Sequence, residues 1–188
     1  MKSLVFVTGN PYKFEVAKKS LGLVNIEVVQ EKLDTPEIQS MEVEEVAAYS
    51  AKWAAEKLGK PVVTSDAGYY IHALRGFPGP FIKYVNGWLS MDEILKMMEG
   101  KTNRSAEVRI CVAYCVPGGK PETFLTKVSG NIALKADNET PGAFMIDRLF
   151  IPEGYDKTLS QFPAEEAVTF WSSREEYWKK LAEHLSQI

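Results

Sequence analysis

The fold of this chain is decided by residues 4–11, which read Leu-Val-Phe-Val-Thr-Gly-Asn-Pro. The apolar run at the start of this stretch contains β-branched residues, which is typical of a buried strand covered on both faces. Asn10 is a good N-cap and Pro11 fits the first helical position, so we expect a helix over residues 12–21. A weakly alternating second strand follows at residues 26–29. This β-α-β opening predicts an α/β protein.

Hydrophobic periodicity predicts further strands and helices around the same sheet. A helix is expected over residues 41–58, and a short buried strand at 62–65 runs into Asp66-Ala67-Gly68. The remaining expected elements are a brief strand at 70–74, helices beginning at 81 and at 92, a hairpin of strands 106–116 and 123–134, a strand at 149–152 and a last helix at 175–187. We therefore expect a single α/β domain over residues 1–188, with an inserted antiparallel layer.

The composition excludes several classes of protein. The 188 residues are 45% hydrophobic and 25% charged, which suits one globular domain with a sizeable core. The formal net charge is -3, so the basic excess of a general nucleic-acid binder is missing. Two cysteines and two histidines predict no zinc cluster and indicate buried thiols in a reducing compartment. No apolar run approaches the ~20 residues that span a bilayer, so we expect a cytoplasmic protein without membrane partners.

The turn between the first strand and helix, residues 8–13, is the first candidate site. Backbone N–H groups at a helix start attract anions, and Lys13 adds a positive charge within the first turn. These residues either cradle a phosphate or form an ordinary capped turn with Lys13 in solvent. The turn contains neither a P-loop motif nor a Rossmann glycine motif.

Three further side chains could serve phosphate or metal chemistry. Asp66 follows an apolar strand, and a carboxylate at the carboxyl end of a strand can hold Mg²⁺ or accept a proton from water. The alternative is that Asp66 only closes a turn. Glu37 lies in a loop and becomes relevant only if the fold brings it beside Asp66. Lys83 follows a loop stiffened by proline, where it either presents a cation to a phosphate or marks a structural corner.

Six motifs follow one another in order along nearly the whole chain. They are Thr8-Gly9-Asn10 with Lys13 and Glu15, Pro36-Glu37-Ile38-Gln39, the helix over 43–56 with Lys52, Ser65-Asp66-Ala67-Gly68, the segment 74–83, and the segment 150–158. Each motif is weak alone. Together and in this order they resemble the inosine triphosphate pyrophosphatase family, whose enzymes remove non-standard purine nucleotides.

This resemblance implies an elongated mixed β-sheet with helices, two lobes and a central cleft, in a homodimer. It implies Mg²⁺-dependent hydrolysis of non-standard purine nucleoside triphosphates, such as ITP, dITP and XTP, to the monophosphate and pyrophosphate. Carried over by position, Glu37 and Asp66 would hold Mg²⁺, and Asp66 would also take the proton of the attacking water. The implied phosphate and substrate contacts are Thr8, Gly9, Asn10, Lys13, Lys52, Ala67 and Lys83.

The half of the family pattern that contacts the nucleobase is altered. Phe144, Asp147 and Arg174 are retained, so a stacking ring, a carboxylate and one donor remain. The family's glycine, aromatic residue, proline, lysine and histidine are replaced by Met145, Ile146, Arg148, Val168 and Ser173. We expect the retained residues and Ser173 to contact the base, with weak discrimination between inosine and adenosine or guanosine triphosphates. A divergent nucleotide-binding or regulatory protein with little turnover is the alternative.

Overall fold

The computed structural model describes residues 2–140 and 145–187 of the chain. Its strands are β1 (Lys2–Val7), β2 (Ile26–Glu31), β3 (Val62–Ile71), β4 (Pro78–Gly79), β5 (Ser105–Cys115), β6 (Glu122–Ile132) and β7 (Phe150–Pro152). Its α-helices are α1 (Pro11–Gly22), α2 (Val43–Leu58), α3 (Ile82–Trp88), α4 (Met91–Met97), α5 (Ala164–Ser172) and α6 (Glu176–Ser186). Its 3₁₀ helices are η1 (His72–Leu74), η2 (Ile146–Arg148) and η3 (Leu159–Gln161). Within these residues no helix has the length and apolar character needed to cross a bilayer.

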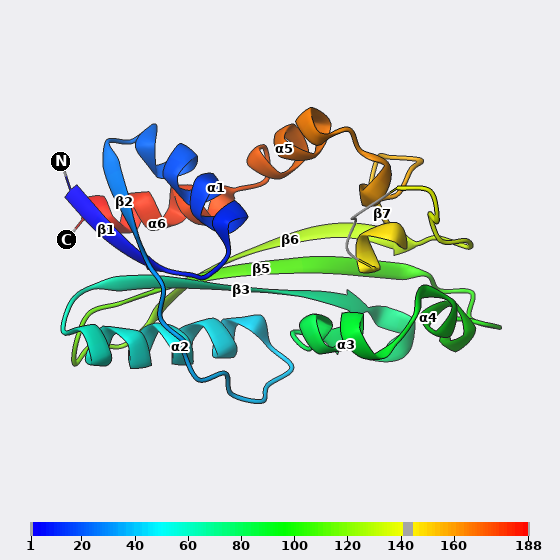
Figure 1. The fold of residues 1–188 in the computed structure, drawn as a ribbon, viewed down its shortest axis with the longest axis horizontal. Helices are drawn as coiled ribbons and strands as arrows, with labels where there is room; N and C mark the ends of the chain where they lie inside the picture. The colour runs from blue at the N-terminus through cyan, green and yellow to red at the C-terminus, as the bar shows by residue number, and fades with distance from the viewer. Residues whose placement is uncertain (1, 141–144, 188) are drawn as a thin grey trace. The chain divides into compact units, whose positions relative to one another are not determined.

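The seven described strands form one mixed sheet in the order β2-β1-β3-β5-β6-β7, with β4 paired to β3 (Figure 1). β1 runs parallel to both β2 and β3, whereas β4 is antiparallel to β3 and β7 is antiparallel to β6. Asn10 caps α1 through its side chain, and Pro11 opens the helix, as the local sequence predicts. The predicted α/β class, with a mixed sheet flanked by helices, is confirmed.

The structure divides into two compact units. The first comprises Met1–Asp66, Ile110–Thr126 and Ser172–Ile188, and the second comprises Ala67–Arg109 and Lys127–Trp171. β3, β5 and β6 each contain residues of both units, so the units share strands instead of being joined by a linker. A single domain over the whole chain stays a prediction.

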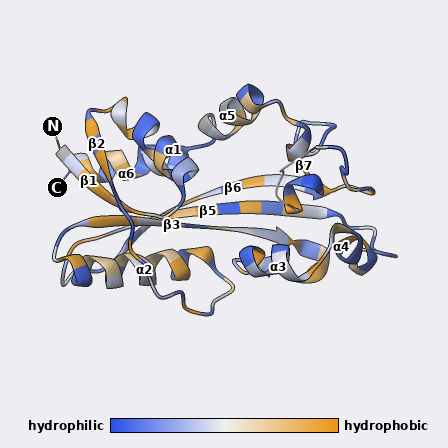
Figure 2. Ribbon diagram, in the orientation of Figure 1, coloured by the Kyte–Doolittle hydropathy of each residue, from blue (hydrophilic) through white to orange (hydrophobic). Residues whose placement is uncertain are grey.

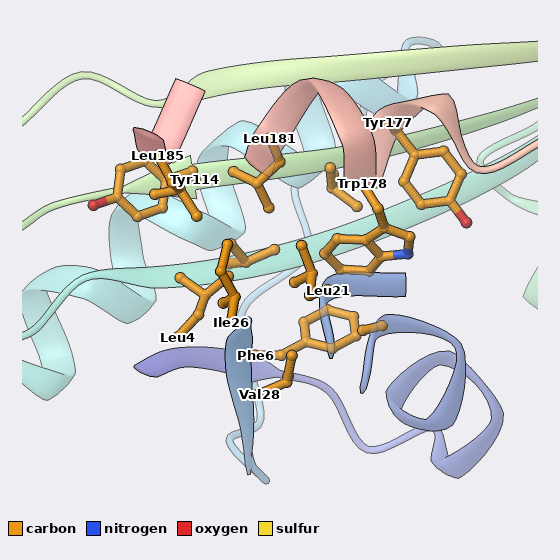
Figure 3. Packing of buried hydrophobic residues seen from close by; sticks show 13 residues of the cluster. Leu4, Phe6, Leu21, Ile26, Val28, Tyr114, Tyr177, Trp178, Leu181 and Leu185 are labelled. Atoms are coloured by element: carbon orange, nitrogen blue, oxygen red, sulfur yellow. The ribbon is translucent and has the colours of Figure 1, made fainter. Parts of the chain in front are cut away.

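A hydrophobic cluster forms the core of the first unit (Figure 3). The ring of Phe6 in β1 meets the ring of Trp178 in α6 edge-on, with 5.3 Å between the ring centroids. Leu21 of α1 and Leu181 of α6 are fully buried in the same cluster. β1 is hydrophobic along most of its length (Figure 2), which fits a strand covered on both faces. The core therefore joins the first strand and helix of the chain to its last helix.

The predicted end of this strand at residue 65 is wrong, because β3 is one unbroken strand of ten residues. β1 pairs with only the first two residues of β3, but β5 and β4 continue the pairing further along it. Gly68 is therefore a strand residue. A Cβ on Gly68 would come within 2.7 Å of the carbonyl carbon of Gly79 in β4. The close approach of these two backbones requires a glycine at position 68.

Two other predictions differ from the structure. The brief strand expected at 70–74 is partly wrong, because residues His72–Leu74 form η1. α5 was not expected, although Ala164, Ala167, Val168 and Trp171 recur at helical spacing in its sequence. The other expected boundaries agree with the structure to within two residues.

Candidate active site

The turn between β1 and α1 is held by its own side chains. Asn10 accepts hydrogen bonds from the backbone N–H groups of Tyr12 at 2.9 Å and of Lys13 at 3.3 Å. Thr8 accepts one from the N–H of Asn10 at 3.1 Å. Pro11 has no N–H, so the first backbone donors of α1 are already used. The N–H groups of Tyr12 and Lys13 are thus capped by Asn10, the phosphate cradle expected at residues 8–13 stays a prediction, and the side chain of Lys13 is the cation of this turn.

Lys13 reaches from α1 to β3. Its Nζ donates a hydrogen bond to the backbone carbonyl of Ser65 over 3.3 Å. Burial lowers the pKa of Lys13, whereas the negative charges of Asp66 and Glu37 raise it. Lys13 is thus a half-buried cation within reach of two carboxylates. Its interpretation as a solvated surface residue is wrong.

Asp66 is half-buried within β3, rather than at the end of a strand. The pairing of β1 with β3 ends at Val63. Lys13 binds the next part of β3, through the carbonyl of Ser65. The side-chain oxygen of Ser65 is buried and has no hydrogen-bond partner among the described residues. Such a hydroxyl can be satisfied by a water molecule or a ligand oxygen. The sequence analysis did not single out Ser65, because the only signal for it in the sequence is its position directly before Asp66.

The two acids suit a hard metal ion. Glu37 lies in the connection between β2 and α2 and is exposed, and its charge acts on the same ammonium as that of Asp66. Carboxylate oxygens are the ligands that Mg²⁺ takes, and one or two of them suffice when substrate phosphates complete the coordination. No group of three or more His, Cys, Asp or Glu side chains in the described part of the chain could hold a metal ion. These residues therefore fit a Mg²⁺ ion shared with a phosphate.

α2 brings an acid toward this region. Burial and the charges of Glu44 and Asp66 raise the pKa of the Cys111 thiol to about 12. Lys52 instead acts on Cys115, whose pKa is raised mainly by burial and lowered by the Lys52 charge. Cys115 lies four residues beyond Cys111 in β5, which is roughly 13 Å at about 3.3 Å per residue. The charges of Glu44 and Asp66 thus both act on Cys111, whereas that of Lys52 acts on Cys115, and the phosphate contact expected of Lys52 stays a prediction.

In the second unit, Asp147 of η2 accepts a hydrogen bond from the hydroxyl of Tyr69 in β3. Burial raises the pKa of Asp147, and this hydrogen bond lowers it. Burial and the neighbouring carboxylate both raise the pKa of Tyr69 well above its usual value, so the phenol keeps its proton and remains a donor. Tyr69 was missed by the sequence analysis, because it belongs to none of the polar patterns considered and lies 78 residues from its partner.

The other predicted substrate contacts of the second unit are Ala67, Lys83 and Phe144. Ala67 is half-buried in β3. Lys83 is exposed in the first turn of α3, with its Nζ 5.9 Å from the centre of the Tyr84 ring. Phe144 lies outside the described residues.

Residues 173–175 connect α5 to α6. Arg174 Nη1 donates a hydrogen bond to the Oγ of Ser173 over 3.0 Å. The hydroxyl of Ser20 in α1 donates to the carboxylate of Glu175, whose pKa is raised by burial. This bond ties the connection to the helix that carries Lys13. The side chain of Val168 lies outside the description.

The fold and these residues define an α/β protein that carries a cation and two carboxylates at one place in the sheet. Comparison with known proteins identifies its family: the model of the Ham1 family matches residues 4–184, and the chain belongs to that family. The resemblance carried by the six motifs is confirmed.

Individual relatives are similar over most of the chain. The dITP/XTP pyrophosphatase of Methanopyrus kandleri is 45% identical over 163 residues, which are 87% of this chain and 86% of that protein. The dITP/XTP pyrophosphatase of Thermococcus kodakarensis is 40% identical over the same shares. A HAM1 protein from Coxiella burnetii has the same fold, with a TM-score of 0.83 at 22% identity over the full length of both chains.

Proposed function

We propose that this protein hydrolyses the triphosphates of non-standard purine nucleosides, such as ITP, dITP and XTP, to the monophosphate and pyrophosphate. The observation that carries this proposal is Lys13, a half-buried cation that bonds to β3 within the field of Asp66 and Glu37. Hydrolysis of a triphosphate needs charge neutralisation beside the reacting phosphorus, and these residues supply it. The names of the relatives from M. kandleri and T. kodakarensis support the substrate class.

The roles divide among the chain's own residues. Attack of water at phosphorus needs little covalent help, so positioning and charge neutralisation carry most of the catalysis. Asp66 accepts the proton of the attacking water, and Lys13 binds a phosphate oxygen through a charge-assisted hydrogen bond. The further proposed phosphate and substrate contacts are Thr8, Gly9, Asn10, Ala67 and Lys83. Lys52 in α2 is proposed as a further phosphate contact.

Mg²⁺ is the metal we propose, held by Glu37 and Asp66. When bound, it would supply positive charge to the phosphate oxygens. The support is that both carboxylates act on one ammonium, so they lie within reach of a single small site.

The nucleobase contacts are proposed from the family pattern: Phe144, Asp147, Ser173 and Arg174. The family's lysine and histidine are replaced by Val168 and Ser173. This replacement is also expected for the alternative function, a nucleotide-binding or regulatory protein with little turnover. The two readings predict different behaviour toward a triphosphate, since only the enzyme releases pyrophosphate.

The deciding experiment measures pyrophosphate release from ITP, dITP, XTP, GTP and ATP with and without Mg²⁺. We expect release from the first three that depends on the metal. Tight binding of ITP without release would support the regulatory alternative, and neither binding nor release would refute both.

The oligomeric state and the cellular location are also proposed. A homodimer is implied by the family resemblance, and light scattering in solution will measure the mass. A cytoplasmic location is supported by the two free, buried thiols of Cys111 and Cys115, which suit a reducing compartment. Cell fractionation tests that location.

A further inference from the structure

Tyr69 and Tyr70 are adjacent in β3 and point to opposite faces of the sheet, as strand geometry requires. The hydroxyl of Tyr69 donates to Asp147. The ring of Tyr70 lies beneath the guanidinium of Arg109, 4.0 Å from it. Two neighbouring phenols thus have separate surroundings within the second unit, and only one of them contacts a residue in the proposed substrate site.

The ring of Tyr69 is held from the side. It meets Phe150 of β7 edge-on, with 5.6 Å between the ring centroids, and Phe150 is fully buried. Gly130 of β6 makes room for Phe150, since a Cβ at Gly130 would come within 2.5 Å of that ring. The position of the Tyr69 hydroxyl is therefore set by packing as well as by its hydrogen bond.

The backbone that carries Asp147 is also held. The next residue, Arg148, donates from Nη1 to the carbonyl of Asp137 at 3.1 Å and from Nη2 to that of Thr140 at 2.6 Å. The N–H of Asp137 donates back to the carbonyl of Arg148 at 3.0 Å. Arg148 stands where the family pattern has a proline, and its three hydrogen bonds give η2 the rigidity that a proline would otherwise provide. Both partners of the Tyr69–Asp147 bond are thus fixed.

A carboxylate is an acceptor with two oxygens and about four lone pairs. The phenol of Tyr69 uses one of these positions, on Oδ1, and so limits the rotation of the group. The remaining lone pairs can accept a hydrogen bond from a second donor. Purine bases offer such donors as ring or exocyclic N–H groups.

Resting on the function proposed above, we infer that Tyr69 is a positioning residue for recognition of the nucleobase: its hydroxyl orients the Asp147 carboxylate to accept a hydrogen bond from an N–H of the purine. Burial raises the pKa of Asp147, and the hydrogen bond from Tyr69 opposes this shift because it favours the charged carboxylate. The altered family motif thereby keeps a polar contact to the base, supported from β3.

The test is Tyr69→Phe, which removes the hydroxyl and keeps the ring contact with Phe150. We expect the KM for ITP to rise about 5-fold, as for the loss of one hydrogen bond, with kcat unchanged within about twofold. The inhibition constant of inorganic tripolyphosphate, which has no base, should stay the same. A general disturbance of the site would change all three quantities.

A double-mutant cycle with Asp147→Asn shows whether Tyr69 acts through Asp147. Asp147→Asn alone should raise the KM for ITP about 10-fold or more, since it removes a charged acceptor. Adding Tyr69→Phe to it should change the KM no further. Tyr70→Phe is the matched control, because it removes a phenol from the opposite face, and it should leave the KM for ITP unchanged.

The outcomes separate the two proposals. An unchanged KM in Tyr69→Phe, or effects that simply add in the double variant, overturns the role of Tyr69 and leaves the hydrolase intact. Absence of pyrophosphate release from every nucleotide by the wild-type chain overturns the hydrolase. In that case calorimetry measures the affinities for ITP and tripolyphosphate in place of the KM and the inhibition constant. Weaker ITP binding by Tyr69→Phe with unchanged tripolyphosphate binding would support the role of Tyr69, and unchanged ITP binding would refute it.

Discussion

Lys13 is the residue whose surroundings best define the candidate site. Burial and two carboxylates act on its pKa in opposite directions, and its ammonium is bonded to a strand carbonyl. A lysine in solvent loses considerable freedom when it grips a phosphate, which weakens binding. Lys13 has already lost part of that freedom in the folded chain. Its attraction for a polyanion is therefore preorganised.

Lys13→Ala should weaken binding of a nucleoside triphosphate by about 10-fold or more, because it removes a charge-assisted contact to phosphate. Binding of the corresponding nucleoside should change little. Lys18→Ala, on the exposed side of the same helix, is the control and should affect neither ligand. Isothermal calorimetry measures all the affinities, and equal losses for nucleoside and triphosphate would contradict a phosphate contact. Lys83→Ala is measured in the same way.

Asp66→Asn should lower kcat by about 100-fold or more, which is the range for losing a positioned proton acceptor. The amide keeps the shape of the carboxylate but cannot take the proton of water. Asp34→Asn, in the exposed loop that precedes Glu37, is the control and should retain full activity. Circular dichroism checks that both variants fold, and near-normal turnover of a folded Asp66→Asn protein would refute the assignment.

Among the elements, β3 depends on a close contact with β4. A Cβ on Gly68 would lie within 2.7 Å of the backbone of Gly79 and 2.9 Å of the nitrogen of Pro80, where no flexible side chain can move aside. Gly68→Ala should therefore lower the free energy of unfolding by about 1–3 kcal/mol. Gly87→Ala in α3 meets no atom within 4 Å and should be neutral or slightly stabilising. Urea unfolding compares the two, and a Gly68→Ala protein as stable as the wild type would mean that β4 can shift without cost.

For the molecule as a whole, acid stability depends on the buried carboxylate of Asp137. Hydrogen bonds from Ser160 and Thr140 lower the pKa of Asp137 from 3.8 to about 2. Because the folded-state pKa is the lower one, this contribution to stability is complete above about pH 4 and is lost as the pH falls toward 2.

Asp137→Asn should therefore be less stable than the wild type at pH 7, by about 1–2 kcal/mol for the weakened hydrogen bonds. The difference between the two unfolding free energies should shrink between pH 4 and pH 2, as the wild-type carboxylate takes up its proton. Unfolding curves across this range measure it. A difference that stays constant with pH would show that Asp137 does not carry the effect.

Local features of this fold could be predicted from sequence, and long-range ones could not. Asn10 and Pro11 set the start of α1 through bonds within three residues, so the signal is complete in the sequence. The course of β3 through Asp66 depends on pairing with β4 and β5, which no local pattern contains. The same limit applies to the site. The motif containing Lys52 marks a helix, but the position of a side chain along that helix relative to Asp66 follows only from packing.

The core of the first unit has a consequence for how the chain is made. Phe6 and Leu21 emerge early from the ribosome, but they pack against Trp178 and Leu181 of α6, which are translated after the entire second unit. Until α6 has appeared, the first strand and helix have no complete apolar surface to bury against. The nascent chain therefore holds this surface open while nearly everything else is synthesised. During this interval the apolar surface of the first strand and helix is most exposed to binding by a chaperone or by another unfinished chain.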